Sequence, residues 1–223
     1  MEFPSTALET ATKLAETHKK RALELFALPF KNHKLYKNAV DASYAPTPNS
    51  KFETIKGEIL IDSTVAKLLA FDHKIKEVRP EDKNRAVYRK FTSISDDAKK
   101  AILECEKGKI LDNNTYMLYQ CMDSSVPLVA RREFTMGRTM FDLSGEAQKV
   151  LVVTASVDCD QKFVEKAVRG QLLSGLLYEE IEPGKCRVTS VCHCDPCGNV
   201  PAVIFNNLLD GQNNFLVKLK AAE

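Results

Sequence analysis

The sequence predicts an α+β fold built around a large antiparallel sheet, and two features of the pattern support this. From Ala98 onward one strand-like segment follows another, and turn residues such as Gly145, Asp160 and Pro183-Gly184 fall in the gaps, as hairpin loops require. A helical pattern opens the chain and another closes it. With no internal repeat or long linker in the 223 residues, we expect one domain over residues 1–223.

The first helix is predicted from its cap and its spacing. Thr6 and Glu9 form a possible capping box, and the helix should end before Leu28-Pro29, because a residue that precedes proline avoids the α region. Apolar residues recur at helical spacing between these limits, namely Leu8, Ala11, Ala15, Ala22 and Phe26.

The next segments change period. Residues 34–43 predict one strand, residues 46–49 a turn, and residues 52–61 an extended segment. Ser63 is the expected cap of a second helix, with Val65, Leu68 and Leu69 on one face. The strands expected after Ala98 cover residues 101–107, 115–121, 134–142, 150–158, 167–181 and 185–193. A last helix is expected over residues 200–220, where Gly211 and Asn213-Asn214 are poor helix formers that favour a kink.

Composition excludes several classes of function. The net charge of +2 gives no basic field for nucleic acid. We see no signal peptide and no run of about 20 apolar residues that would span a bilayer. Seven cysteines without framework spacing favour a reducing compartment, so we expect a soluble cytoplasmic monomer.

The sequence lacks the common catalytic motifs and carries one pair of cysteines with metal-site spacing. The sequence has no nucleophile elbow, Walker loop, dinucleotide fingerprint or H-E-x-x-H, so we expect a non-enzyme without a cofactor. Cys194-x-x-Cys197 has zinc-finger-like spacing. Strand alternation, however, places Cys192 and Cys194 on one face and His193 on the other, so we predict reduced thiols and no metal.

Several segments together resemble a known family. Residues 167–207, AVRGQLLSGLLYEEIEPGKCRVTSVCHCDPCGNVPAVIFNN, resemble the end of START (StAR-related lipid transfer) domains. Residues 132–138, REFTMGR, resemble the family's R-D-F-x-x-x-R stretch, and residues 57–72, GEILIDSTVAKLLAFD, resemble its strand-to-helix segment. Phe91-Thr92 departs from the family's Trp-Asp pair, and Cys197 stands where lysine is common. The resemblance implies a helix-grip fold, in which a curved antiparallel sheet of about nine strands wraps around a long C-terminal helix and encloses a hydrophobic tunnel.

Arg138 is the most informative site residue. Alternation puts it on one face with Phe134 and Met136, and the resemblance turns that face toward the tunnel. The partner position implied by the family is Gln120, which cannot neutralise the charge, so an anionic or phosphate-bearing ligand group is favoured. Glu104 is the nearest acid in sequence, and a solvated arginine on the outer face is the alternative. The other residues that we predict to contact lipid are Leu118, Cys192, Val203, Ile204 and Leu208.

The loop between two predicted strands carries four successive non-polar residues, Val126, Pro127, Leu128 and Val129. Turn loops are usually polar, so this run needs a partner. The resemblance implies a loop that gates the tunnel beside the C-terminal helix and touches the membrane. The alternative is a loop packed against its own domain.

These expectations combine into one function. The chain is predicted to hold one lipid (a phospholipid, sterol or sphingolipid) in its tunnel and to transfer it between membranes without catalysis, in transient contact with the membrane surface. Two alternatives stay open: a ligand-gated interaction module, and a helix-grip enzyme that acts on an apolar small molecule.

Overall fold

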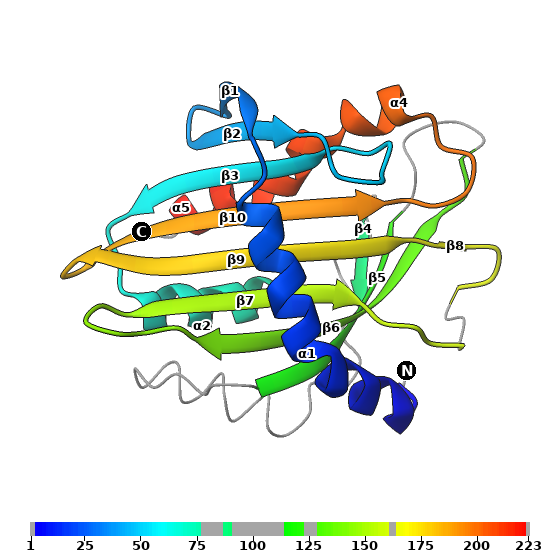
Figure 1. The fold of residues 1–223 in the computed structure, drawn as a ribbon, viewed down its shortest axis with the longest axis horizontal. Coiled ribbons are helices and arrows are strands. Elements are labelled where there is room, and N and C mark those ends of the chain that lie inside the picture. Colours follow the sequence, from blue (N-terminus) through cyan, green and yellow to red (C-terminus); the bar gives the residue numbers. More distant parts are fainter. Residues whose placement is uncertain (1–2, 77–86, 91–113, 123–128, 161–163, 222–223) are drawn as a thin grey trace.

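The computed structural model describes residues 3–76, 87–90, 114–122, 129–160 and 164–221. In these residues one ten-stranded sheet has the order β1-β2-β3-β10-β9-β7-β6-β5-β4, with β8 paired to β6 (Figure 1). All pairs are antiparallel except β8 with β6. The strands are β1 (Lys31–Tyr36), β2 (Val40–Ala45), β3 (Thr54–Ile61), β4 (Val87–Lys90), β5 (Asn114–Met122), β6 (Arg132–Asp142), β7 (Lys149–Ser156), β8 (Val168–Arg169), β9 (Gln171–Glu182) and β10 (Lys185–Asp195).

Helices cover both faces of the sheet. Helix α1 (Ser5–Phe26) crosses one face, which we call the outer face, and contacts β5, β6, β7, β9 and β10 (Figure 1). The opposite, inner face carries α2 (Val65–Lys76) and the C-terminal segments α4 (Ala202–Asn206), η1 (Leu209–Asn213) and α5 (Asn214–Lys220). This curved sheet held against C-terminal helices is the predicted helix-grip architecture, so the fold class is confirmed.

Period-two alternation sorts the strand residues between two cores. The outer core joins α1 to the sheet and contains Ala15, Ala22, Leu25, Phe141, Leu151, Val153, Ala155, Leu173 and Val191. The larger inner core joins α2 and α5 to the sheet and includes Ile59, Leu68, Leu69, Met140, Val152, Tyr178, Val188, Leu216 and Leu219. Because both faces are buried, each long strand needs apolar residues at odd and at even positions.

The limits of the first two helices agree with the sequence better than their caps do. Helix α1 ends at Phe26, as expected, but its N-cap is Pro4 and makes no side-chain cap hydrogen bond, so the capping box of Thr6 and Glu9 was wrong. In α2 the backbone N–H of Lys67 donates to Thr64 Oγ1 (3.4 Å), so Thr64 caps this helix in place of Ser63.

Three predicted elements are interrupted in the structure. The single strand expected over residues 34–43 is a hairpin, because Lys37 and Asn38 adopt positive φ (49° and 53°), the backbone that a two-residue turn requires. The strand expected over residues 167–181 breaks at Gly170, where a Cβ would lie 2.4 Å from the ring of Phe134. The final helix is not continuous, and its break falls at η1, which contains Gly211. The strand predicted over residues 101–107 and the pair Phe91-Thr92 lie outside the described residues.

The approach of α1 to the sheet gives a test of the fold. A Cβ on Gly137 in β6 would lie 2.6 Å from Cβ of Ala11 in α1, so Gly137→Ala should push the helix away and lower the free energy of unfolding by about 1–3 kcal/mol. Gly145→Ala is the matched control, since nothing lies within 4 Å of its Cβ position. Equal urea midpoints for the two variants would show that α1 does not pack closely here.

Candidate functional site

A cavity of about 120 Å³ lies in the inner face, beneath η1 and α5. Its wall combines apolar side chains with neutral hydrogen-bonding groups. The apolar ones are Leu118, Met136, Leu172, Leu176, Cys192 and Phe215, and the polar ones include Gln120, Thr154, Ser174, Ser190 and Gln212. Pockets for small organic ligands usually measure about 300–1,000 Å³, so a large ligand requires the C-terminal segments to move.

Four of the predicted lipid contacts lie at this cavity. Leu118, Gln120, Met136 and Cys192 all line it. Phe134 does not, because it is buried beside Leu118 and Met136 and packs against Gly170. Their contact with lipid stays a prediction.

The three predicted contacts from the C-terminal helix lie elsewhere. Val203, Ile204 and Leu208 are 75%, 39% and 52% exposed, so the cavity lining expected of them is corrected. The helix is interrupted after α4, and its contribution to the cavity comes from Gln212 and Phe215 in the later segments. The prediction of cavity residues in this region relied on the apolar face of the expected helix, so it omitted the polar residue Gln212.

Arg138 is buried on the inner face, as alternation predicted, but its partner is different. Its side chain pairs with Asp72 of α2, and its Nη1 also donates to Thr154 Oγ1 at 2.9 Å. Both charged residues are essentially inaccessible, with Arg138 1% and Asp72 0% exposed. Gln120 lies opposite Phe134, so the expected pairing was wrong. Glu104 lies outside the described residues.

The sequence contained a signal for Asp72 that we did not use. Val65, Leu68 and Leu69 form the buried face of α2, and Asp72 continues that face at helical spacing. An acid on a buried helix face requires a buried cation. Only the tertiary fold brings α2 to β6 and makes Arg138 that cation.

The electrostatics follow from this pair. Burial lowers the pKa of Arg138, but Asp72, Tyr116 and Tyr178 together outweigh burial and leave that pKa above its ordinary value. Burial, and then the charge of Asp72, raises the pKa of Tyr178 well above its ordinary value. The positive charge of Arg138 is therefore balanced inside the protein, and the argument that it requires an anionic ligand group no longer holds.

The residues of the R-E-F motif hold the end of the sheet. Arg132 donates from Nε to the carbonyl of Pro196 (2.7 Å) and from Nη2 to that of Cys197 (3.2 Å). Glu133 is fully buried and accepts hydrogen bonds from the Tyr119 hydroxyl (2.8 Å) and from Arg169 Nη2 (2.9 Å). These contacts tie β5, β6, β8 and the turn after β10 together.

The predicted gate is described only in part. Val126, Pro127 and Leu128 lie outside the described residues, and Val129 is half-buried. Among the described residues no helix is long and apolar enough to cross a membrane.

The described cysteines are free thiols, and burial raises the pKa of Cys194 well above its ordinary value. No group of three or more His, Cys, Asp or Glu side chains within the described ranges is arranged to hold a metal ion. The absence of bound metal at Cys192, Cys194 and Cys197 stays a prediction.

The fold and its cavity define the class: an α+β helix-grip domain whose sheet and C-terminal segments line a partly open cavity. The START domain family model matches residues 88–222, and the chain belongs to this family. A search of curated proteins found no match.

Solved structures share the fold at low sequence identity. Human StAR-related lipid transfer protein 5 superposes with a TM-score of 0.68 at 17% identity, over 96% of each chain. The lipid transfer and protein localization domain of human StarD13 gives 0.61 at 17% identity, over 93% of this chain and 95% of that one. Human STARD10 gives 0.62 at 14% identity, over 92% and 77%.

The buried ion pair gives a prediction about stability. Asp72→Asn leaves the guanidinium of Arg138 buried without a counter-charge, so it should lower the free energy of unfolding by about 3–5 kcal/mol. The double variant Asp72→Leu with Arg138→Met removes both charges and should recover most of that loss. Urea unfolding of the three proteins measures this. If the double variant loses more stability than Asp72→Asn, Arg138 and Asp72 do not act as a pair.

Proposed function

We propose that this protein binds one lipid in the inner cavity and transfers it between membranes, as a monomer and without chemical change. The observation that carries the proposal is a cavity on the inner face of a START fold, with an apolar wall and neutral polar groups. The solved relatives that are named as lipid transfer proteins support it. The free cysteines support a reducing compartment, which we propose to be the cytoplasm.

The physical gain of such a carrier is the removal of acyl chains from water. Each buried CH₂ contributes about 0.8 kcal/mol, so an enclosed cavity greatly lowers the free energy of a lipid outside a membrane. The polar groups of the wall then select the headgroup, because a buried donor or acceptor without a partner costs about 1–3 kcal/mol.

The C-terminal segments are the part that we propose to open. Gln212 and Phe215 line the cavity from these segments, and they lie on either side of the junction between η1 and α5. Asn213 at this junction is fully buried, and neither polar atom of its side chain has a hydrogen-bond partner among the described residues. An unsatisfied amide disfavours the closed form relative to one in which water or a lipid headgroup reaches it.

The β1–β2 hairpin holds these segments closed. Lys34 Nζ lies 2.5 Å from Asp210 Oδ2, and the hydroxyl of Tyr44 also donates to Asp210. The Tyr36 hydroxyl and Lys37 Nζ donate to Asn214 Oδ1, at 3.0 and 2.5 Å. Both η1 and α5, which together we call the lid, are thus attached to one hairpin.

Asp210 therefore offers a test of the lid. Asp210→Ala removes the acceptor of both Lys34 and Tyr44, so it should accelerate release of a fluorescent lipid to acceptor vesicles by a few-fold. Glu146→Ala, which removes an exposed acid in the loop between β6 and β7, is the control. If Asp210→Ala releases lipid at the unchanged rate, the contacts of the hairpin with Asp210 do not control the opening of the lid.

The exposed apolar residues of α4 are the proposed membrane contact. Val203 and Ile204 lie on this short helix, and Leu208 follows it, so three large apolar side chains face outward together. Contiguous exposed apolar residues mark surfaces that bind a partner or a membrane. Because α4 precedes the lid in the chain, insertion of α4 into a bilayer would place the opening next to lipid.

The double variant Val203→Asp with Leu208→Asp tests this contact. It should slow lipid exchange between vesicles about tenfold or more, because each side chain loses up to about 1.5–3 kcal/mol of apolar burial in the bilayer. Both sites are exposed, so the melting temperature should not change. Leu23→Asp on α1, exposed on the outer face, is the control and should exchange lipid normally.

Lipid binding itself is tested by native mass spectrometry and lipid extraction of the purified chain. One copurifying lipid per monomer would support the proposal. A chain that carries no lipid and takes none from vesicles would overturn it, whatever the two lid tests show.

A further inference from the structure

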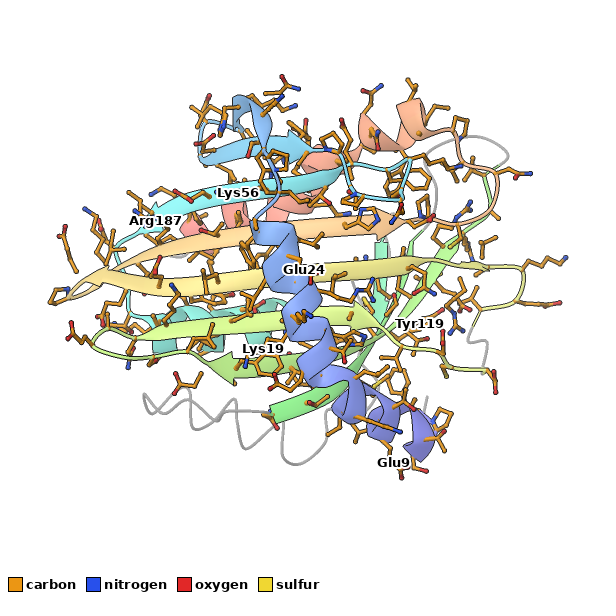
Figure 2. All side chains as sticks on the ribbon, viewed as in Figure 1. Glu9, Lys19, Glu24, Lys56, Tyr119 and Arg187 are labelled. Atoms are coloured by element: carbon orange, nitrogen blue, oxygen red, sulfur yellow. The ribbon has the colours of Figure 1, made fainter. Side chains whose placement is uncertain are left out.

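A second recess lies on the outer face, away from the lipid cavity. It is a groove of about 530 Å³ between α1, the loop that joins β2 to β3, and the ends of β9 and β10. Figure 2 shows Glu24, one of its lining residues, where α1 crosses the sheet. The proposed lipid carrier makes no use of this groove, and its size falls within the range of small-ligand pockets.

Two histidines and an arginine converge in the groove. His18 of α1 is only 8% exposed and has no hydrogen-bond partner among the described residues, yet its ring is part of the groove wall. His193 of β10 contacts Thr47 Oγ1 through Nδ1 at 3.1 Å. Arg21 makes no ion pair within the described part of the chain, and its charge acts on both imidazoles.

We propose that this groove binds a small molecule through a carboxylate or phosphate group held by Arg21 and His18, beside His193. Guanidinium and imidazole N–H groups are strong donors to such oxygens, and the hydroxyl of Thr47 stands beside them. The side chain of His18 lines the groove from α1, so a ring N–H of His18 can donate to an anionic group there.

Two acids limit what the groove accepts. Glu24 and Asp195 also line it, and Asp195 Oδ1 accepts a hydrogen bond from the backbone N–H of Cys197 at 2.7 Å. Their charges oppose any ligand that covers the groove with several negative groups. We infer a ligand with one anionic group, and not a polyanion such as nucleic acid.

Acidity should strengthen this binding. Burial, and then the charge of Arg21, lowers the pKa of His18. Burial also lowers the pKa of His193, although Asp195 and the backbone of Glu53 oppose this. Glu24 is the remaining charged group facing the rings from α1, and the loop and β9 contribute none. Both imidazoles are therefore neutral near pH 7 and become cationic only below pH 6.5, where an anion gains further attraction.

The same pKa shifts predict how an anion changes stability. The unfolded chain protonates its histidines near pH 6.5, whereas the folded chain does so only at lower pH, so stability falls as the pH drops below 6.5. A bound anion favours the protonated folded form. Phosphate or acetate should therefore offset part of this loss.

The test is an NMR titration of the full chain with sodium phosphate and with sodium acetate, at pH 7.0 and 5.5, following the ring C–H signals of His18 and His193. We expect both signals to shift with saturation, and the affinity for acetate, which is an anion at both pH values, to rise at pH 5.5. Arg21→Gln should weaken binding at least about tenfold, because a hydrogen bond to a charged group is lost. Lys20→Gln removes the same charge one residue away, outside the groove, and should bind normally.

The outcomes separate the source of the anion. Vesicles that contain phosphatidylserine form a second arm of the titration. Shifts with soluble anions support a free small-molecule ligand, and shifts with vesicles alone assign the anionic group to a lipid headgroup at the same residues. Absence of shifts in both arms, or equal weakening by Arg21→Gln and Lys20→Gln, overturns the proposal. In Arg21→Gln both histidine pKa values should rise, which verifies that Arg21 faces the rings in the folded protein.

Discussion

Burial of the Arg138 guanidinium constrains the inner half of this structure. A cation that is 1% exposed needs a counter-charge within the fold, and among the described residues Asp72, on a helix far away in sequence, supplies it. The pair thereby fixes α2 against β6, and α5 in turn contacts α2. Thr154 connects the pair to the site, because its hydroxyl accepts from Arg138 and its side chain lines the cavity. The ion pair between Arg138 and Asp72 therefore helps to position α2. It also holds Thr154 in the cavity wall and balances the charge of Arg138.

The sequence predicted those parts of the fold that depend on local pattern. Strands β5, β6, β7 and β10 appeared near their true limits, because alternation and turn residues are local signals. Breaks that depend on tertiary contact were missed. Gly170 interrupts a strand because Phe134 occupies the space of a side chain, and Phe134 lies 36 positions earlier. The prediction of a partner for Arg138 was wrong for the same reason. Gln120 was chosen because it lies on the neighbouring strand, whereas the actual partner, Asp72, comes from α2.

Some residues of the family-like stretches hold the sheet together, and others line the cavity. Arg132, Glu133 and Arg169 belong to the stretches that resemble START domains, and all three make contacts that tie strands and turns together. Contacts of this kind hold the sheet together, and they do not depend on which ligand is bound. The cavity wall combines residues of these stretches, such as Met136, Ser174 and Ser190, with Gln120 and Gln212, which lie outside them. Membership of the family therefore describes the container, and the lipid that we propose for it would also meet Gln120 and Gln212, which lie outside these stretches.

Strand alternation also explains how one thin sheet can serve two chemically different recesses. On β10, Cys192 faces the inner cavity, while the next residue, His193, lies in the outer groove. Each neighbour along a strand points to the opposite face, so the inner wall can be apolar and neutral while the outer wall is charged. The glycines permit close cover on both sides: Gly57 admits Asn213 and Leu216 on the inner face, and Gly137 admits α1 on the outer one. A lipid enclosed on one face and an anion held on the other would then be separated by a single layer of backbone, whose hydrogen bonds are satisfied within the sheet.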